Sequence, residues 1–165
     1  MPDPTTLEAL RLRALPFPID AAARALWQTR LNELPVTRLY DTRFDLSDPA
    51  IVRLALETIG EQHLGGLGTH AVNGAVIAGM FDAALGVAGT LHHAARRVGT
   101  VELSIKLMRP VFDAPLEVLS IAVKCTPHLA FTSAELYGAG KLCATASGIV
   151  AVASGPKGRE PDAYW

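Results

Sequence analysis

Hydrophobic residues near the start of the chain recur every three or four positions. This spacing, which extends over residues 5–33, predicts amphipathic helices. Pro16 and Pro18 interrupt it, so we expect two short helices instead of one long helix. Asp20 is suited to cap the second helix, which should end before Pro35.

Strand patterns follow Pro35. Residues 36–44 and 51–57 mix β-branched and aromatic side chains with charges, and a Ser-Asp-Pro turn signal separates them, which predicts a pair of strands. Residues 59–69 contain four glycines and show no hydrophobic period. We therefore expect a sharply bent loop over 59–69.

The second half of the chain has the pattern of an antiparallel sheet. Strict alternation over Val101–Leu107 predicts a strand with one buried and one solvated face. Turn residues at Asp113–Pro115 and Gly138–Gly140 have hairpin length, so neighbouring strands should run antiparallel. The four predicted strands are residues 100–112, 116–125, 130–138 and 141–154.

The most hydrophobic segment lies between these two sets of strands. Over Ala71–Leu91 the only charged residue is Asp82, and small residues predominate. A helix that is apolar nearly all round is buried nearly all round, so we predict an α+β domain in which an antiparallel sheet wraps around a long central helix. We divide the chain into an N-terminal helical segment (1–34), this domain (35–154) and a flexible tail (155–165).

Composition narrows the range of partners. The 165 residues carry a net charge of −1, without the positive excess that phosphate-backbone binding needs, which argues against nucleic acid. A charge near zero also gives little protection against self-association, in line with an oligomer.

Cys125 and Cys143 have no metal-site or disulfide spacing, so we expect both in the core. The N-terminus has no basic-then-apolar signal, which predicts a cytoplasmic protein.

Asp82 allows four interpretations. The apolar segment has the length of a membrane span, but the carboxylate would then lie mid-bilayer, and the flanking glycine loop and hairpins argue against a membrane. Asp82 can instead lie at a solvent-exposed point of the helix, or be buried and paired as a structural group. The fourth interpretation is that Asp82 performs chemistry.

The start of the predicted helix favours chemistry. Asn73 is a favourable N-cap residue, and Gly74 and Ala75 leave backbone N–H groups at the positive end of the helix dipole, where a developing oxyanion is stabilised. Gly74 and Asp82 are eight residues apart, which separates them by about 12 Å along the axis. Two copies packed antiparallel across a two-fold axis would bring each Asp82 to the other copy's Gly74. We therefore expect a homo-oligomer, either a dimer or a dimer of dimers.

The segment NGAVIAGMFD, residues 73–82, resembles the motif H-G-G-x-x-x-x-L-x-D of the hotdog-fold thioesterases of the phenylacetate-degradation type. The resemblance covers about residues 35–153, and Arg109-Pro110, Phe112 and the closing strand LCATASGIV also suit it.

This resemblance implies a hotdog fold, sites between subunits, and hydrolysis of an acyl- or aryl-CoA thioester with no cofactor beyond the coenzyme A of the substrate. It implies that Asp82 is a general base or nucleophile and that the Gly74 N–H donates to the thioester oxygen. Asn73 replaces the His of the motif and Ala75 its second Gly. Asn73 can cap the helix and position a substrate, but it cannot carry a proton near neutral pH.

Histidines and arginines supply candidate substrate contacts. The family often places a polar residue that orients water or substrate in the loop before the helix, where this chain has His63 and His70. Arg96, Arg97 and Arg109 are candidates for binding the phosphates of coenzyme A. No His or Cys spacing matches a metal site, so we expect no metal.

Two other functions remain open. A hotdog domain can bind acyl-CoA without hydrolysing it, as a sensor or carrier, and the absence of the motif His suits this alternative. A hotdog dehydratase or isomerase would need a catalytic His paired with an acid on the central helix, which has no such His.

Overall fold

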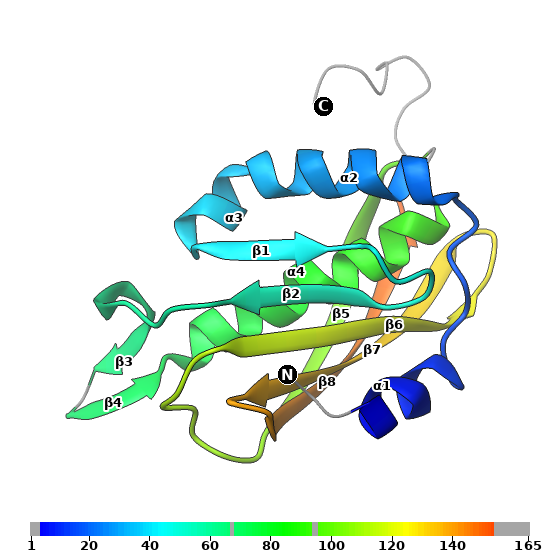
Figure 1. The fold of residues 1–165 in the computed structure, drawn as a ribbon. Coiled ribbons are helices and arrows are strands. Elements are labelled where there is room, and N and C mark those ends of the chain that lie inside the picture. The colour runs from blue at the N-terminus through cyan, green and yellow to red at the C-terminus, as the bar shows by residue number, and fades with distance from the viewer. Residues whose placement is uncertain (1–3, 67, 94–95, 154–165) are drawn as a thin grey trace.

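The computed structural model describes residues 4–66, 68–93 and 96–153 (Figure 1). Helical elements are α1 (Pro4–Arg11), α2 (Ala21–Glu33), α3 (Pro35–Leu39), the short 3₁₀ helix η1 (Glu61–His63) and α4 (Gly74–His92). Strands are β1 (Thr42–Asp45), β2 (Val52–Leu56), β3 (Leu64–Gly66), β4 (Thr69–Val72), β5 (Val98–Leu107), β6 (Leu116–Cys125), β7 (Leu129–Gly138) and β8 (Lys141–Val152).

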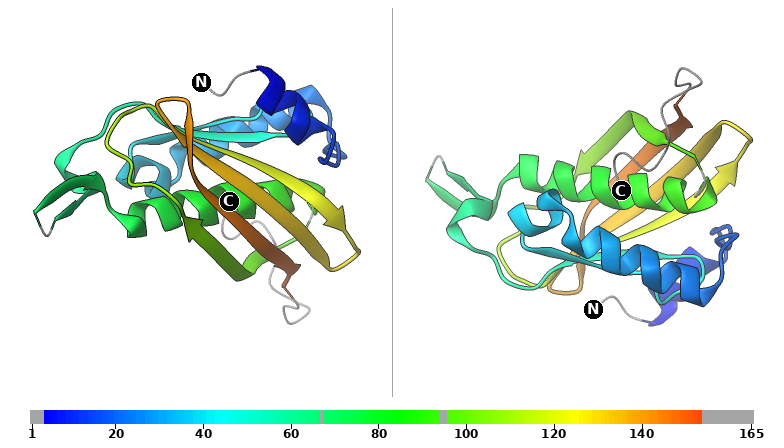
Figure 2. Two further views of the ribbon diagram at one scale, coloured as in Figure 1. Left: turned by 90° about the horizontal axis from the view of Figure 1, so that it is seen from below. Right: turned by 90° about the horizontal axis from the view of Figure 1, so that it is seen from above.

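Six strands form one antiparallel sheet in the order β1-β2-β6-β7-β8-β5, and β3 and β4 form a separate hairpin. The helix α4 lies against the inner face of the sheet, and α1 lies on the opposite face (Figure 2). This arrangement confirms the predicted sheet around a long central helix. The side chains of α4 that are most fully buried are those of Met80, Phe81, Ala84, Leu85, Ala88 and Leu91.

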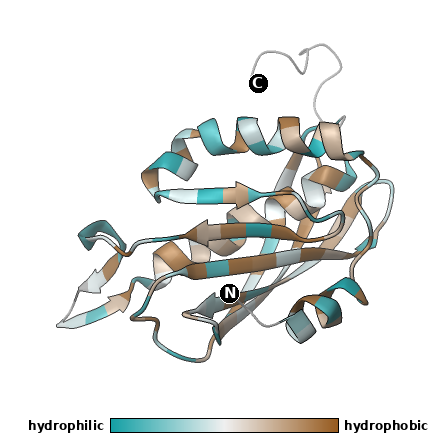
Figure 3. Cartoon of the chain, in the orientation of Figure 1, coloured by the Kyte–Doolittle hydropathy of each residue, from teal (hydrophilic) through white to brown (hydrophobic). Residues whose placement is uncertain are grey.

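The composition of α4 explains how the sheet can approach it. Hydrophobic residues mark α4 and the neighbouring strands β2 and β6 (Figure 3). Where the helix meets β8, a Cβ on Gly89 would come within 2.6 Å of the Val150 Cβ, so only glycine fits there. By length and hydropathy alone α4 could cross a membrane, but more than half of its apolar window is buried inside the protein, as in a core helix.

The N-terminal helices cover two surfaces of the sheet. Leu10 of α1 is buried on the outer face against Leu119, Ile121 and Tyr137. Asp20 caps α2 as predicted, because its Oδ1 accepts a hydrogen bond of 2.8 Å from the Ala23 N–H.

The helix α2 also closes one edge of the sheet. Asn32 donates to the Phe44 carbonyl at 3.0 Å and accepts from the Phe44 N–H at 2.7 Å, and Gln28 accepts from the Leu46 N–H. These amides satisfy backbone groups that an edge strand would otherwise expose. The sheet therefore cannot extend past β1.

Two predictions for the region after Pro35 were only partly correct. The predicted strand pair forms as β1 and β2, which pair antiparallel. Residues 35–39 form α3 instead of a strand, because Pro35 occupies the first turn of a helix, where its missing N–H costs nothing. The predicted loop at 59–69 contains η1 and the strands β3 and β4, which pair around Gly68, a residue with φ of +77°. Residue 67 of that predicted loop lies outside the described residues.

The four later strands were predicted correctly, but two details differ. The turn at Asp113–Pro115 is not a hairpin, because β5 pairs with β8 at the edge while β6 pairs with β2 and β7. The apolar face of β5 is also not fully buried, since Val101 and Leu107 are 65% and 58% exposed on an edge strand.

The predictions for the last turn and for the two cysteines were confirmed in part. The turn at 138–140 is the predicted hairpin, with positive φ at Ala139 and Gly140. Cys143 is buried as expected, whereas Cys125 is only partly buried. The predicted flexible tail, residues 155–165, lies outside the described residues.

Candidate active site

The N-terminus of α4 presents a free backbone donor. Asn73 caps the helix as predicted: its Oδ1 accepts from the Ala75 N–H at 2.9 Å. The Asn73 N–H in turn donates to the His63 carbonyl at 2.7 Å, which fixes the start of the helix. Gly74 is exposed, and its N–H makes no hydrogen bond within the described residues. The helix dipole and this N–H together offer a site for a developing negative charge.

A groove of about 250 Å³ surrounds Gly74. One wall of the groove is the start of α4, and the other is the chain at the end of β5 and after it. A 2.8 Å hydrogen bond from the Val72 N–H to the Val111 carbonyl connects this second wall to β4. Arg109 is exposed on this wall, so of the three predicted arginines it is the one that lies beside the Gly74 N–H. The groove is lined by Ala71, Val72, Gly74, Ile77, Leu107, Met108, Arg109, Pro110 and Val111.

Asp82 lies in a second groove, of about 220 Å³. This groove runs over the outer face of α4, between α2 on one side and the start of β5 on the other. Most of its surface is apolar, and Asp82 is its only acidic group; the side chain is exposed in the single chain. The lining residues are Trp27, Leu31, Leu34, Asp82, Ala83, Gly86, Val87, Thr90, Val98, Gly99, Thr100 and Val150.

One chain does not bring Gly74 and Asp82 together. They lie in different grooves, and two turns of helix separate them by about 12 Å. Attack on a carbonyl carbon requires the donor and the base within about 3 Å of the same reacting group. A complete site built on these two residues therefore needs a second copy of the chain.

His63 is fully buried and uses both ring nitrogens inside the protein. Its Nδ1 accepts from the Gly60 N–H at 2.9 Å, so its Nε2 carries the proton and donates to the Tyr40 carbonyl at 3.1 Å. The ring has no surface to offer a substrate. We therefore revise the predicted substrate contact at His63 to a structural link between Tyr40 and the start of α4.

The other predicted residues lie apart from the two grooves. His70 is exposed on β4, and Ala75 is exposed in the first turn of α4. Arg96 lies past the C-terminal end of α4, where it donates to the Pro127 carbonyl at 2.7 Å, and Arg97 is exposed next to it. Both arginines are thus at the opposite end of α4 from Gly74.

His92, the last residue of α4, and the following His93 are partly buried. The ring of His92 packs against Phe17, with 5.4 Å between ring centroids. Burial, and next the neighbouring His93, hold the pKa of His92 below its ordinary value. The described residues contain no group of three or more His, Cys, Asp or Glu side chains that could hold a metal ion.

Sequence reasoning missed Tyr40. Its ring lies over Gly79 of α4, one turn before Asp82, and no periodicity or motif singles it out. Only the contact between two segments 39 positions apart along the chain reveals it.

Comparison with known proteins identifies the fold. Residues 69–144 match the model of the Thioesterase superfamily. A comparison with curated proteins gives no match.

Solved structures of thioesterase-superfamily proteins are similar to this chain over most of its length. A Shewanella oneidensis protein related to the superfamily is 17% identical, with a TM-score of 0.70 over 82% of this chain and 99% of its own. A thioesterase from Haemophilus influenzae is 12% identical, with a TM-score of 0.68 over 75% of this chain and 86% of its own. Zebrafish thioesterase superfamily member 2 is 17% identical, with a TM-score of 0.65 over 82% and 99%. The hotdog-like fold expected from the motif at 73–82 is therefore confirmed.

Proposed function

We propose that this protein hydrolyses an acyl- or aryl-CoA thioester to the free acid and coenzyme A, as a hotdog thioesterase of the phenylacetate-degradation type. One observation carries the proposal: α4 begins with the Gly74 N–H, which has no hydrogen-bond partner among the described residues, and carries the Asp82 carboxylate on its open face. Similarity to the Thioesterase superfamily supports thioester hydrolysis in general.

In the proposed reaction the Gly74 N–H donates to the thioester oxygen, which polarises the carbonyl and stabilises the oxyanion that forms there. Asp82 of the facing subunit takes a proton from the attacking water, or attacks the carbonyl carbon itself. As a base, Asp82 passes that proton to the sulfur as the C–S bond breaks, so coenzyme A leaves as the thiol. As a nucleophile, Asp82 displaces coenzyme A as the thiolate, and water then cleaves the mixed anhydride, which frees the acid and Asp82 and supplies the proton to the thiolate. Asn73 holds the helix start in place, and Arg109 is the arginine best situated to meet a phosphate of coenzyme A.

The edges of the sheet support a homodimer. The amides of α2 close the edge at β1, whereas no described element pairs with the outer edge of β5. Val101, Leu107 and Met108 are exposed on and just after β5, an apolar surface of the kind that a second copy covers. Leu107 also lines the Gly74 groove, so a partner at this edge would lie next to the oxyanion donor.

Thiol release from a panel of acyl- and aryl-CoA substrates tests the proposal. We expect wild-type protein to turn over part of the panel and Asp82→Asn to lose about 10²- to 10⁴-fold in kcat, the usual contribution of a general base, while still binding coenzyme A. Glu33→Gln, which neutralises an exposed carboxylate outside both grooves, is the matched control. Binding without any wild-type turnover would support the sensor or carrier alternative, and equal rates in wild type and Asp82→Asn would rule out Asp82 as the base.

A further inference from the structure

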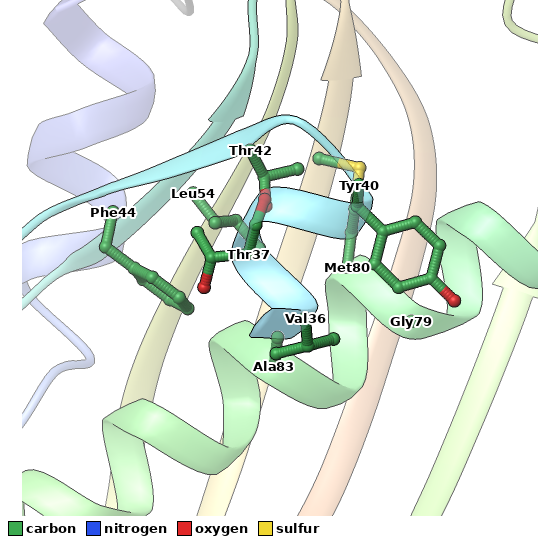
Figure 4. Close-up of a pocket in the computed structure, with 9 residues that line it drawn as sticks. All are labelled: Val36, Thr37, Tyr40, Thr42, Phe44, Leu54, Gly79, Met80 and Ala83. Carbon is green, nitrogen blue, oxygen red and sulfur yellow. The ribbon is translucent and has the colours of Figure 1, made fainter. Parts of the chain in front are cut away.

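Tyr40 lies at the junction of α3 and β1 with its ring next to α4. A Cβ on Gly79 would be only 3.3 Å from Cε2, Cζ and Oη of this ring, so the absence of a side chain at Gly79 lets the ring rest on the helix backbone. Figure 4 shows the ring beside Gly79 and Met80, with Val36 and Ala83 further along the same side of the helix.

The space between α3, β1 and this part of α4 is almost filled. Its free volume is about 10 Å³, about the space of one water molecule, and its walls are nearly all apolar. Ala83 lines both this space and the groove that holds Asp82. The filled space therefore adjoins the Asp82 groove at Ala83, and Tyr40 is the largest side chain in its lining.

His63 connects Tyr40 to the start of α4 through two hydrogen bonds, and a third hydrogen bond holds the His63 ring. The His63 Nε2 holds the Tyr40 carbonyl at 3.1 Å, and the His63 carbonyl holds the Asn73 N–H at 2.7 Å. The third bond, from the Gly60 N–H to Nδ1, fixes the ring itself. A buried ring with both nitrogens engaged has one orientation, so it sets the position of Tyr40 relative to Gly74.

We propose that Tyr40 is a specificity-determining residue that forms the end wall for the acyl group, and that His63 is the positioning residue that holds this wall. The inference rests on the proposed function and refines its substrate class: the acyl chain or aryl ring extends from the Asp82 groove toward Gly79 and stops at the phenol ring. Substrates with short acyl chains or a single ring are then favoured, and long chains are excluded by collision with Tyr40.

The test compares hydrolysis of butanoyl-CoA and dodecanoyl-CoA. Removal of the ring in Tyr40→Ala should raise the dodecanoyl-to-butanoyl ratio of kcat/KM about 10-fold or more, because each methylene accommodated in an apolar pocket contributes at least that much discrimination. Tyr40→Leu should shift the ratio in the same direction but by a smaller factor. This variant provides the test if Tyr40→Ala does not fold. Leu39→Ala, which truncates the exposed neighbour on α3, should keep the wild-type ratio.

Two variants of His63 separate positioning from simple stability. His63→Gln keeps an amide donor near the Nε2 position for the Tyr40 carbonyl, whereas His63→Asn keeps only the acceptor near Nδ1 for the Gly60 N–H. Both should lower the unfolding temperature, but only His63→Asn should move the ratio toward that of Tyr40→Ala. Equal ratios in the two variants would show that His63 is merely structural.

Binding of non-hydrolysable S-butyl- and S-dodecyl-CoA thioethers gives a readout that does not depend on turnover. Tyr40→Ala should tighten the Kd for the dodecyl thioether relative to the butyl thioether by a similar factor. An unchanged ratio in both assays, with wild-type turnover intact, would overturn the end wall and leave the proposed hydrolysis standing. Absence of wild-type turnover together with a shifted Kd ratio would overturn the proposed hydrolysis and keep the end wall.

Discussion

At the scale of single residues, Gly74 shows how one backbone group can be tested without disturbing the fold. It is the first residue of α4, where a proline is favoured because the N–H has no partner within the helix. The preceding Asn73 has φ of −61° and ψ of 133°, the extended conformation that a following proline requires. Gly74→Pro can therefore remove the proposed oxyanion donor and keep the helix start.

We expect Gly74→Pro to lower kcat by about 10²- to 10³-fold, the usual contribution of one oxyanion donor, with a nearly unchanged unfolding temperature. Gly74→Ala retains the N–H, and its Cβ would meet Leu107 Cδ1 at an ordinary 3.6 Å, so its loss should be much smaller. Thiol-release kinetics and thermal unfolding of both variants check this expectation. Comparable losses in the two would mean that bulk at position 74, and not the N–H, decides activity.

At the scale of elements, α4 contains glycines of two kinds. Gly89 faces β8, where an added Cβ would lie 2.6–3.0 Å from three side-chain atoms of Val150. Gly86 faces open space on the Asp82 groove, and its nearest neighbour, Thr100 Oγ1, is 3.6 Å from an added Cβ. The same substitution should therefore have opposite effects three residues apart.

Gly89→Ala should lower the free energy of unfolding by about 1–3 kcal/mol, because the stiff, β-branched Val150 cannot move aside without strain. Gly86→Ala should leave it unchanged or raise it by up to about 1 kcal/mol through better helix propensity. Denaturant unfolding of both variants measures the difference. Combining Gly89→Ala with Val150→Ala should recover part of the loss, and a loss that persists in full would contradict the steric explanation.

At the scale of the whole molecule, the proposed site combines residues of two copies of the chain, and this can be tested by complementation. Asp82→Asn and Gly74→Pro should each be inactive alone. A mixed dimer contains one site with both lesions and one site with neither, if each site pairs Gly74 of one chain with Asp82 of the other.

Refolding the two variants together at equal concentrations should restore about one quarter of wild-type activity, since half of the dimers are mixed and each has one intact site of two. Two separately refolded samples mixed without subunit exchange form the control. Activity that stays at the level of the single variants in the co-refolded sample would show that the site does not combine residues of two chains, and sedimentation would then decide the oligomeric state.

The sequence was sufficient for features that depend on local physics. Helix periodicity, the caps at Asp20 and Asn73, and strand alternation predicted α1, α2, α4 and the four later strands, because each signal lies within a few residues of the element that it specifies. It failed at 35–39, where a five-residue helix has too few positions to show a period.

The sequence by itself also determined where the candidate chemistry lies: a capped, glycine-initiated helix with one carboxylate two turns further on. Only the tertiary structure decided that the two groups open into separate grooves, that β5 pairs with β8 at an open edge, and that His63 is turned inward to hold Tyr40. Those outcomes depend on contacts between residues far apart along the chain, and such contacts leave no local pattern to read. The energy that fixes them comes from burial and hydrogen bonding after the segments have met.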